Sequence, residues 1–103
     1  MELEKLKNIL ESTGLPVAYL DFPEGEAPPL PYLCYLCTDD NPLFADGITY
    51  FTSTNVTVEL YTQFKSPSVE QQVEAALQAY HWKKDETYID SERCYMITYD
   101  IEV

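Results

Sequence analysis

The sequence is poor in basic residues, glycine and histidine. Six Lys and Arg residues stand against 18 Asp and Glu residues, so the formal net charge of the 103-residue chain is −12. A surface with this charge repels nucleic-acid phosphate, which argues against DNA binding through a basic face. Three glycines leave little material for a phosphate-cradling loop. No apolar run is long enough to span a bilayer and no basic, apolar leader opens the chain, so we expect a soluble protein without export or a membrane partner.

The acidic charge is unevenly placed, because the stretch from Asn8 to Phe64 contains no Lys or Arg. Acidity of this kind can serve solubility alone. It can also line a passage through which DNA slides, or mimic DNA toward a protein that binds nucleic acid. Composition leaves these three interpretations open.

The cysteines are an odd number, Cys34, Cys37 and Cys94, which favours free thiols over a disulfide framework. The spacing of Cys34 and Cys37 resembles that of redox or zinc sites. Their segment, however, reads as a strand, in which these two positions point to opposite faces. We therefore expect no metal site here and no other cofactor.

The clearest strand signal runs from Asn55 to Phe64, where apolar and polar residues alternate. One predicted face holds Val56, Val58, Leu60 and Phe64. The other holds Asn55, Thr57, Glu59, Tyr61 and Gln63. Ser66 and Pro67 then suit the start of a helix whose apolar spacing continues to Tyr80, and Lys83 and Lys84 would form its basic end.

The remaining patterns place this strand and helix in a single α+β domain spanning residues 1–103. A helix is predicted from Glu2 to Thr13, ended by Gly14. Further strands are predicted at 17–20, 32–38, 48–52, 86–90 and 94–103, the last two as a hairpin around residues 91–92. The resulting order is α-β-β-β-β-α-β-β, a mainly antiparallel sheet with two helices packed on one face.

The predicted strand at 32–38 and the loop after it contain the residues best suited to contacts. The strand is apolar on both faces, which fits either a strand covered on both sides or one that meets another subunit. Leu43 and Phe44 are apolar residues in a loop, where they either fold back or meet a partner. Asp39, Asp40 and Asp46 lie in the same loop without the ligand order of an EF-hand.

No pattern indicates catalysis. No nucleophile or carboxylate lies at a spacing from His81 that would indicate a catalytic pair. Glu59 lies on the polar face of its predicted strand, where we expect it to be a cross-strand partner. We expect no enzymatic activity.

Several short stretches together resemble small proteins encoded among the neck and tail assembly genes of siphophages and prophages of Gram-positive bacteria. They are Leu15-Pro16-Val17, Phe22-Pro23-Glu24, Pro31-Tyr32, Tyr35-Leu36, Ala45-Asp46, Tyr50, Glu59-Leu60-Tyr61-Thr62, Glu86-Thr87-Tyr88-Ile89-Asp90-Ser91-Glu92 and Tyr99. Size and element order are also similar to the tail terminators of that region. The resemblance implies a ring of identical subunits, typically a hexamer, that caps the tail tube and contacts the head connector or adaptor.

The resemblance also implies a virion location at the head–tail junction, with assembly in the bacterial cytoplasm. DNA would pass by without specific binding. Candidate ring or partner contacts are Tyr32, Tyr35, Leu43, Phe44, Glu59 and Tyr61. Candidates for an acidic lumen or loop are Asp39, Asp40 and Asp46. A small head–tail adaptor and an acidic DNA-mimic inhibitor of a host protein are the alternatives.

Overall fold

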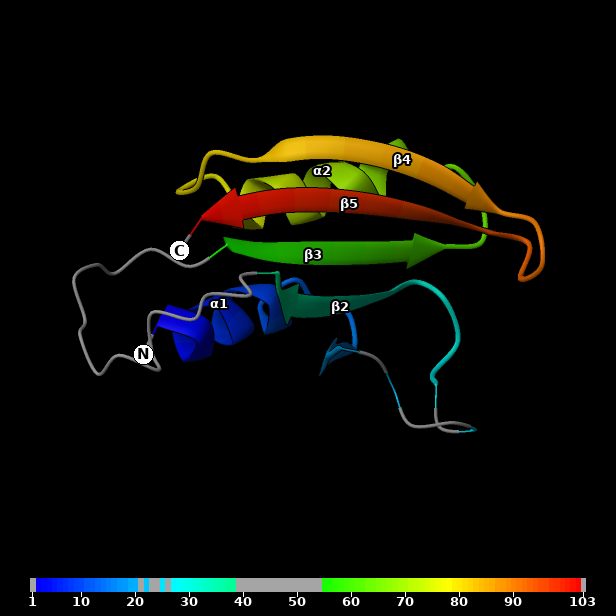
Figure 1. Cartoon of the computed structure of the whole chain (residues 1–103). Helices are drawn as coiled ribbons and strands as arrows, with labels where there is room; N and C mark the ends of the chain where they lie inside the picture. Colours follow the sequence, from blue (N-terminus) through cyan, green and yellow to red (C-terminus); the bar gives the residue numbers. More distant parts are fainter. Residues whose placement is uncertain (1, 21, 23–24, 26, 39–54, 103) are drawn as a thin grey trace.

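In the part of the chain that the structure describes, five strands form one sheet, and two helices pack on one of its faces (Figure 1). The computed structural model describes residues 2–20, 22, 25, 27–38 and 55–102. Its elements are α1 (Glu2–Glu11), β1 (Val17–Tyr19), β2 (Tyr32–Cys37), β3 (Asn55–Thr62), α2 (Pro67–Ala76), β4 (Lys83–Ile89) and β5 (Cys94–Glu102). The predicted α+β class is confirmed. The strand predicted at 48–52 lies outside the described residues.

The strand order is β1-β2-β3-β5-β4, with β3 at the centre. β2, β3, β5 and β4 pair antiparallel, whereas the three-residue β1 runs parallel to β2. In this register Leu60 of β3 stands between Leu33 of β2 and Ile97 of β5. Among the described strands, β1 and β4 lie at the two edges of the sheet.

The hydrophobic core lies between the helices and the sheet face that they cover, here called the inner face. Alternation along β3 turns Val56, Val58 and Leu60 to this face, as predicted. From the helices and the other strands the core takes Leu6, Leu10, Leu33, Tyr35, Val73, Leu77, Ile97, Tyr99 and Ile101. Each fully buried Leu, Ile or Val side chain contributes about 1.5–3 kcal/mol through removal of apolar surface from water, so this face is the main source of stability.

β3 is shorter than predicted. It ends at Thr62, which is 2% exposed and takes the last inward position. Phe64, predicted to share the core face, is 72% exposed. The chain has already left the sheet before Phe64, so strand alternation no longer determines where its side chain points.

The second helix is also shorter than predicted. α2 starts with Pro67 in its first turn, as expected, although the Ser66 side chain makes no capping hydrogen bond. It ends at Ala76, and Tyr80 packs against the core from the turn that follows. Lys83 and Lys84 therefore open the edge strand β4 and do not form a basic helix end. Pairing with β5 along the whole length of β4 outweighs the helical spacing here.

Candidate interaction surface

Three of the predicted contact residues, Tyr32, Glu59 and Tyr61, lie together on the sheet face opposite the helices, here called the outer face. Alternation places them there, since their neighbours Leu33 and Leu60 point into the core. Residues of β2, β3 and β5 form the middle of the outer face. They are Tyr32, Cys34, Leu36, Thr57, Glu59, Tyr61, Met96, Thr98 and Asp100.

Tyr32 and Tyr61 face each other across neighbouring strands. Their ring centroids are 5.2 Å apart, and the Phe22 ring packs edge-on against Tyr32 at 5.0 Å. The Tyr61 hydroxyl donates a hydrogen bond to Glu59 Oε1 at 2.9 Å. Burial and this hydrogen bond raise the pKa of Tyr61 above its ordinary value, so the phenol remains a neutral donor near neutral pH. These contacts hold the side chains in one arrangement.

A shallow pocket of about 270 Å³ opens beside this cluster. Its walls are Phe22, Ala27, Tyr32, Cys34, Tyr61 and Glu92. Aromatic walls with a carboxylate at the rim suit an apolar side chain that carries a donor group.

A second fixed contact lies further along the outer face. The Thr57 hydroxyl donates to Asp100 Oδ1 at 2.6 Å, across the β3–β5 pair. The outer face is therefore polar at this end and aromatic around Tyr61. Protein interfaces also combine aromatic residues at their centre with polar residues around them.

Tyr35, which we also predicted as a contact residue, is part of the core. It is 7% exposed, and its ring packs edge-on against Tyr19 at 5.1 Å. Burial, with a smaller contribution from the Glu11 carboxylate, raises the pKa of Tyr35. The placement on the contact surface was wrong because residues 32 and 35 differ by an odd number, so a strand turns them to opposite faces.

The other predicted contact and lumen residues lie outside the described residues. They are Asp39, Asp40, Leu43, Phe44 and Asp46. Their roles stay predictions.

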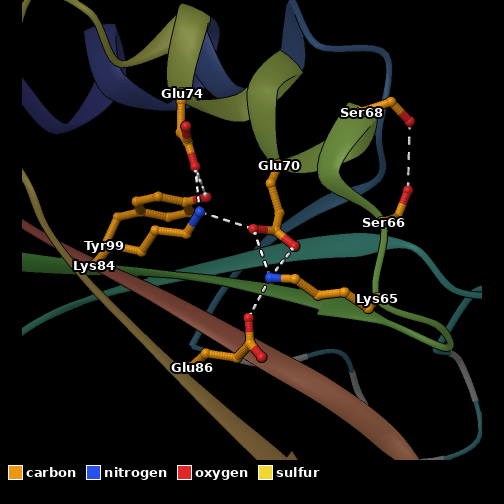
Figure 2. Close-up of polar contacts among 8 residues, drawn as sticks. All are labelled: Lys65, Ser66, Ser68, Glu70, Glu74, Lys84, Glu86 and Tyr99. Carbon is orange, nitrogen blue, oxygen red and sulfur yellow. Dashed lines mark hydrogen bonds and ion pairs between the residues drawn. The ribbon is translucent and has the colours of Figure 1, made fainter.

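A charged cluster on the inner side of the sheet was missed by the sequence interpretation (Figure 2). Its centre is Glu70 of α2, which is 3% exposed. Lys84 of β4 lies 2.7 Å from Glu70 Oε1. Lys65, from the connection before α2, lies 2.8 Å from Glu70 Oε2 and donates a hydrogen bond to Oε1 at 3.0 Å. One buried carboxylate thus holds two ammonium groups that come from different parts of the chain.

Further carboxylates complete the cluster. Lys65 also pairs with Glu86 of β4, and Lys84 lies 2.7 Å from Glu74 Oε2. The Tyr99 hydroxyl donates to the same Glu74 oxygen at 2.8 Å. The contacts attach the edge strand β4 to α2.

The protonation states in the cluster follow from burial and pairing. Burial alone would raise the pKa of Glu70, but hydrogen bonds from Lys65 and Lys84 outweigh it and lower the pKa. Burial would lower the pKa of Lys84, and its bonds to Glu70 and Glu74 raise it. Burial and the bond to Glu74 raise the pKa of Tyr99. Glu70 is thus held ionised, Lys84 protonated and Tyr99 neutral, which is the protonation state that each partner requires. This arrangement suits a structural clamp better than proton transfer.

The sequence did contain a signal for this cluster. Glu70 and Glu74 are four residues apart, so they share one face of a helix. Lys84 and Glu86 are two residues apart, so they share one face of a strand. The signal was lost because Lys84 was assigned to the helix end.

The three cysteines are free thiols, as predicted. Cys34 lies on the outer face whereas Cys37 packs against the core, so the two side chains point apart. Burial raises the pKa of Cys94, which makes its thiol a poor nucleophile. In the described ranges, no group of three His, Cys, Asp or Glu side chains is arranged to hold a metal ion.

His81 is exposed and lies in the short connection before β4. It lines a separate pocket of about 440 Å³ together with Asp100 and Glu102. Within the part of the chain that the structure describes, the imidazole makes no hydrogen bond or ion pair.

Comparison of the chain with models of protein families, with curated proteins and with solved structures found no match. Across the described residues, no helix is both long and apolar enough to cross a membrane.

Proposed function

We propose that the chain is a structural protein of the head–tail junction of a phage or prophage, a tail terminator that caps the tail tube as a homo-oligomeric ring and joins it to the head connector. The observation that carries this proposal is the division of the sheet into two faces. The inner face is filled by the core, while the outer face presents Tyr32, Tyr61 and Glu59 in a fixed arrangement. A preordered aromatic surface of this kind supports a binding role.

The charge distribution also supports a junction protein. A chain with a net charge of −12 repels DNA. DNA could therefore pass such a ring without adhering to it. The ionised side chains of the Glu70 cluster are paired with one another, which supports a structural protein over an enzyme.

Electron microscopy of tail tubes assembled with and without the protein tests this proposal. We expect tubes of limited length with ring-shaped density at one end when the protein is present. Tyr61→Ala should reduce the fraction of capped tubes, since it removes the ring against Tyr32 and the donor to Glu59. Gln78→Ser, which changes an exposed residue in the turn after α2 and off the outer face, is the control and should cap normally.

Tubes that continue to grow with bare ends would contradict the tail-terminator proposal. If the protein then binds the isolated head connector, a head–tail adaptor remains as the alternative. Binding of the protein to both the tail tube and the head connector would support the joining role.

A second candidate, an acidic DNA mimic that inhibits a host protein, is favoured by the net charge alone. It requires tight, salt-sensitive binding to a basic host protein, because displaced counterions would dominate the affinity. A pull-down from host lysate at low and high salt tests this function. Recovery of no basic protein at low salt would remove it.

A further inference from the structure

The pocket beside Tyr61 on the outer face has the size of a site for one side chain. Its volume is about 270 Å³, whereas pockets for small molecules have volumes of about 300–1,000 Å³. Three parts of the chain supply its described walls: the segment before β2 with Phe22 and Ala27, the paired strands β2 and β3 with Tyr32, Cys34 and Tyr61, and the turn between β4 and β5 with Glu92. The pocket therefore suits a single side chain of a partner better than a whole metabolite.

Aromatic rings form much of the pocket wall. The Tyr32 ring contacts two others, with the Phe22 centroid 5.0 Å away and the Tyr61 centroid 5.2 Å away. The face of an aromatic ring carries partial negative charge, so it attracts a cation placed within about 6 Å of its centroid. Cys34, which is 2% exposed, adds a small apolar wall to the same pocket. A cation in this pocket would therefore lie against rings from both β2 and β3.

Tyr61 and two glutamates add acceptor groups to the aromatic wall. The Tyr61 hydroxyl donates its single proton to Glu59 Oε1 at 2.9 Å, so its oxygen offers only lone pairs to a ligand. Glu59 thereby also brings a carboxylate next to Tyr61. Glu92 is exposed and places a second carboxylate at the pocket itself. Rings, lone pairs and carboxylates all favour a ligand that carries positive charge and N–H donors.

Most cations of the chain are placed far from this negative charge. Among the described residues that line the pocket, Glu92 carries the only charge. The walls from β2, β3 and the segment before them belong to the stretch from Asn8 to Phe64, which has no Lys or Arg. Four of the six cations lie on the helix side of the sheet, and they are Lys5 and Lys7 of α1 and Lys65 and Lys84 of the Glu70 cluster.

The last two cations, Lys83 and Arg93, do not line the pocket either. Lys83 stands opposite Asp100 on β5, whereas Tyr61 stands opposite Met96, so Lys83 lies further along the sheet. Arg93 follows Glu92 in the sequence but lines a separate depression. A cation that matches the charge of the pocket must therefore come from a partner.

We propose that the pocket receives an arginine side chain of a partner protein, whose guanidinium packs against the rings of Tyr32 and Tyr61 and pairs with Glu92. A guanidinium is planar and weakly hydrated, so it can lie on an aromatic face while its N–H groups still reach a carboxylate. The methylene stem of arginine suits the apolar part of the wall. A lysine ammonium is more strongly hydrated and lacks the planar fork, so it fits the same wall less well.

Such a contact would give the outer face an energetic centre. Arginine and tyrosine are among the side chains most enriched at the residues that dominate binding energy in protein interfaces. The net charge of −12 would also draw a basic partner surface toward the chain before the arginine is seated. This inference rests on the proposed function for the existence of a protein partner and adds the chemistry by which the partner is recognised.

An NMR titration of the full chain with Nα-acetyl-L-arginine methylamide tests the pocket without any partner protein. We expect saturable shifts of the ring protons of Phe22, Tyr32 and Tyr61, with a dissociation constant of about 1 mM for a probe of this size. The citrulline analogue has nearly the same shape but no charge. It should bind at least about fivefold more weakly, because it loses both the attraction to the rings and the pairing with Glu92.

Three variants separate the pocket from general attraction to an acidic chain. Glu92→Gln should weaken binding of the arginine probe about two- to fivefold, since it removes an exposed charge pair. Phe22→Leu keeps an apolar wall without a ring and should weaken it by a similar factor. Glu102→Gln makes the same change in net charge at an exposed position at the far end of β5, and it should bind like wild type. If Phe22→Leu does not keep the unfolding midpoint of wild type, Glu92→Gln in its exposed turn still decides the test.

Three outcomes would overturn the proposal: ring shifts that do not saturate, equal binding of the arginine and citrulline probes, or a Glu92→Gln variant that binds no more weakly than Glu102→Gln. The outcome for the proposed function is separate. A chain that caps tail tubes but does not bind the arginine probe would remove this inference and leave the terminator role. A chain that binds the probe in the pocket but never joins a tube or connector would leave the pocket and remove that role.

Discussion

The two faces of the sheet differ in what their side chains contact, although the residues of the two faces alternate along the same strands. On the inner face of β3, Val56, Val58 and Leu60 are enclosed by helices and neighbouring strands. On its outer face, Thr57, Glu59 and Tyr61 bond to polar groups of the same face and remain partly exposed. One strand therefore serves stability with every second residue and presents the others on the outer face, which the proposed function uses for recognition.

The edges of the sheet add a second contrast. At the β4 edge, the Glu70 cluster attaches the strand to α2 through paired charges (Figure 2). At the β1 edge the strand has only three residues and is joined to the rest by the parallel ladder with β2. The long edge strand is secured by paired charges in addition to its backbone pairing with β5, whereas the short one relies on its ladder with β2 and on the contacts of Tyr19.

The largest difference between the faces is expected from neighbouring substitutions on β3. Leu60→Ala should lower the free energy of unfolding by about 2–5 kcal/mol, because it leaves a cavity in a fully buried site. Glu59→Ala, one residue away on the outer face, should lower it by less than about 1 kcal/mol. Urea unfolding followed by the fluorescence of Trp82, which packs against Tyr99 at 5.3 Å, measures both. Equal losses would contradict the division of roles between the faces.

A smaller loss is expected at the clamp on β4. Glu70→Gln keeps the volume of the side chain but leaves Lys65 and Lys84 without their shared carboxylate. Removing one partner of a fully buried pair costs about 3–5 kcal/mol. Here the lysine side chains are 44% and 33% exposed, so water compensates in part and we expect about 1–3 kcal/mol.

Glu74→Gln is the matched control for this clamp. Glu74 is more exposed than Glu70 and lies one helical turn away, so its substitution should cost less. A larger loss for Glu74→Gln would show that Glu70 is not the centre of the cluster.

The smallest effect concerns pH. The pKa of Glu70 lies below its ordinary value of about 4.5 in the folded chain, so its contribution to stability is present above that value and is lost as pH falls through the folded pKa. The stability difference between wild type and Glu70→Gln should therefore shrink between neutral pH and about pH 3. The cost of Leu60→Ala, which involves no titrating group, should change little over the same range. A difference for Glu70→Gln that grows on acidification would contradict this assignment.

Much of the fold could be predicted from local patterns. Period-two alternation identified the inner and outer residues of β3 through Tyr61. Gly14, with a φ of 86°, closes the turn that follows the first helix, although α1 itself ends at Glu11 and not at the predicted Thr13. These predictions succeeded because each depends on residues that are neighbours in the chain.

Tertiary contacts decided the rest. Phe64 and Lys84 each continue a local period in the sequence, yet one is exposed beyond the end of β3 and the other belongs to β4. Tyr35 was assigned to the contact surface by its apolar strand, and its position opposite Val58 places it in the core. The Glu70 cluster joins residues of α2 and β4 that no local spacing relates. The sequence by itself therefore determined which residues share a face within an element. Only the pairing of β4 with β5 and the packing of α2 decided where the elements end and which charges meet, because both depend on residues distant in the chain.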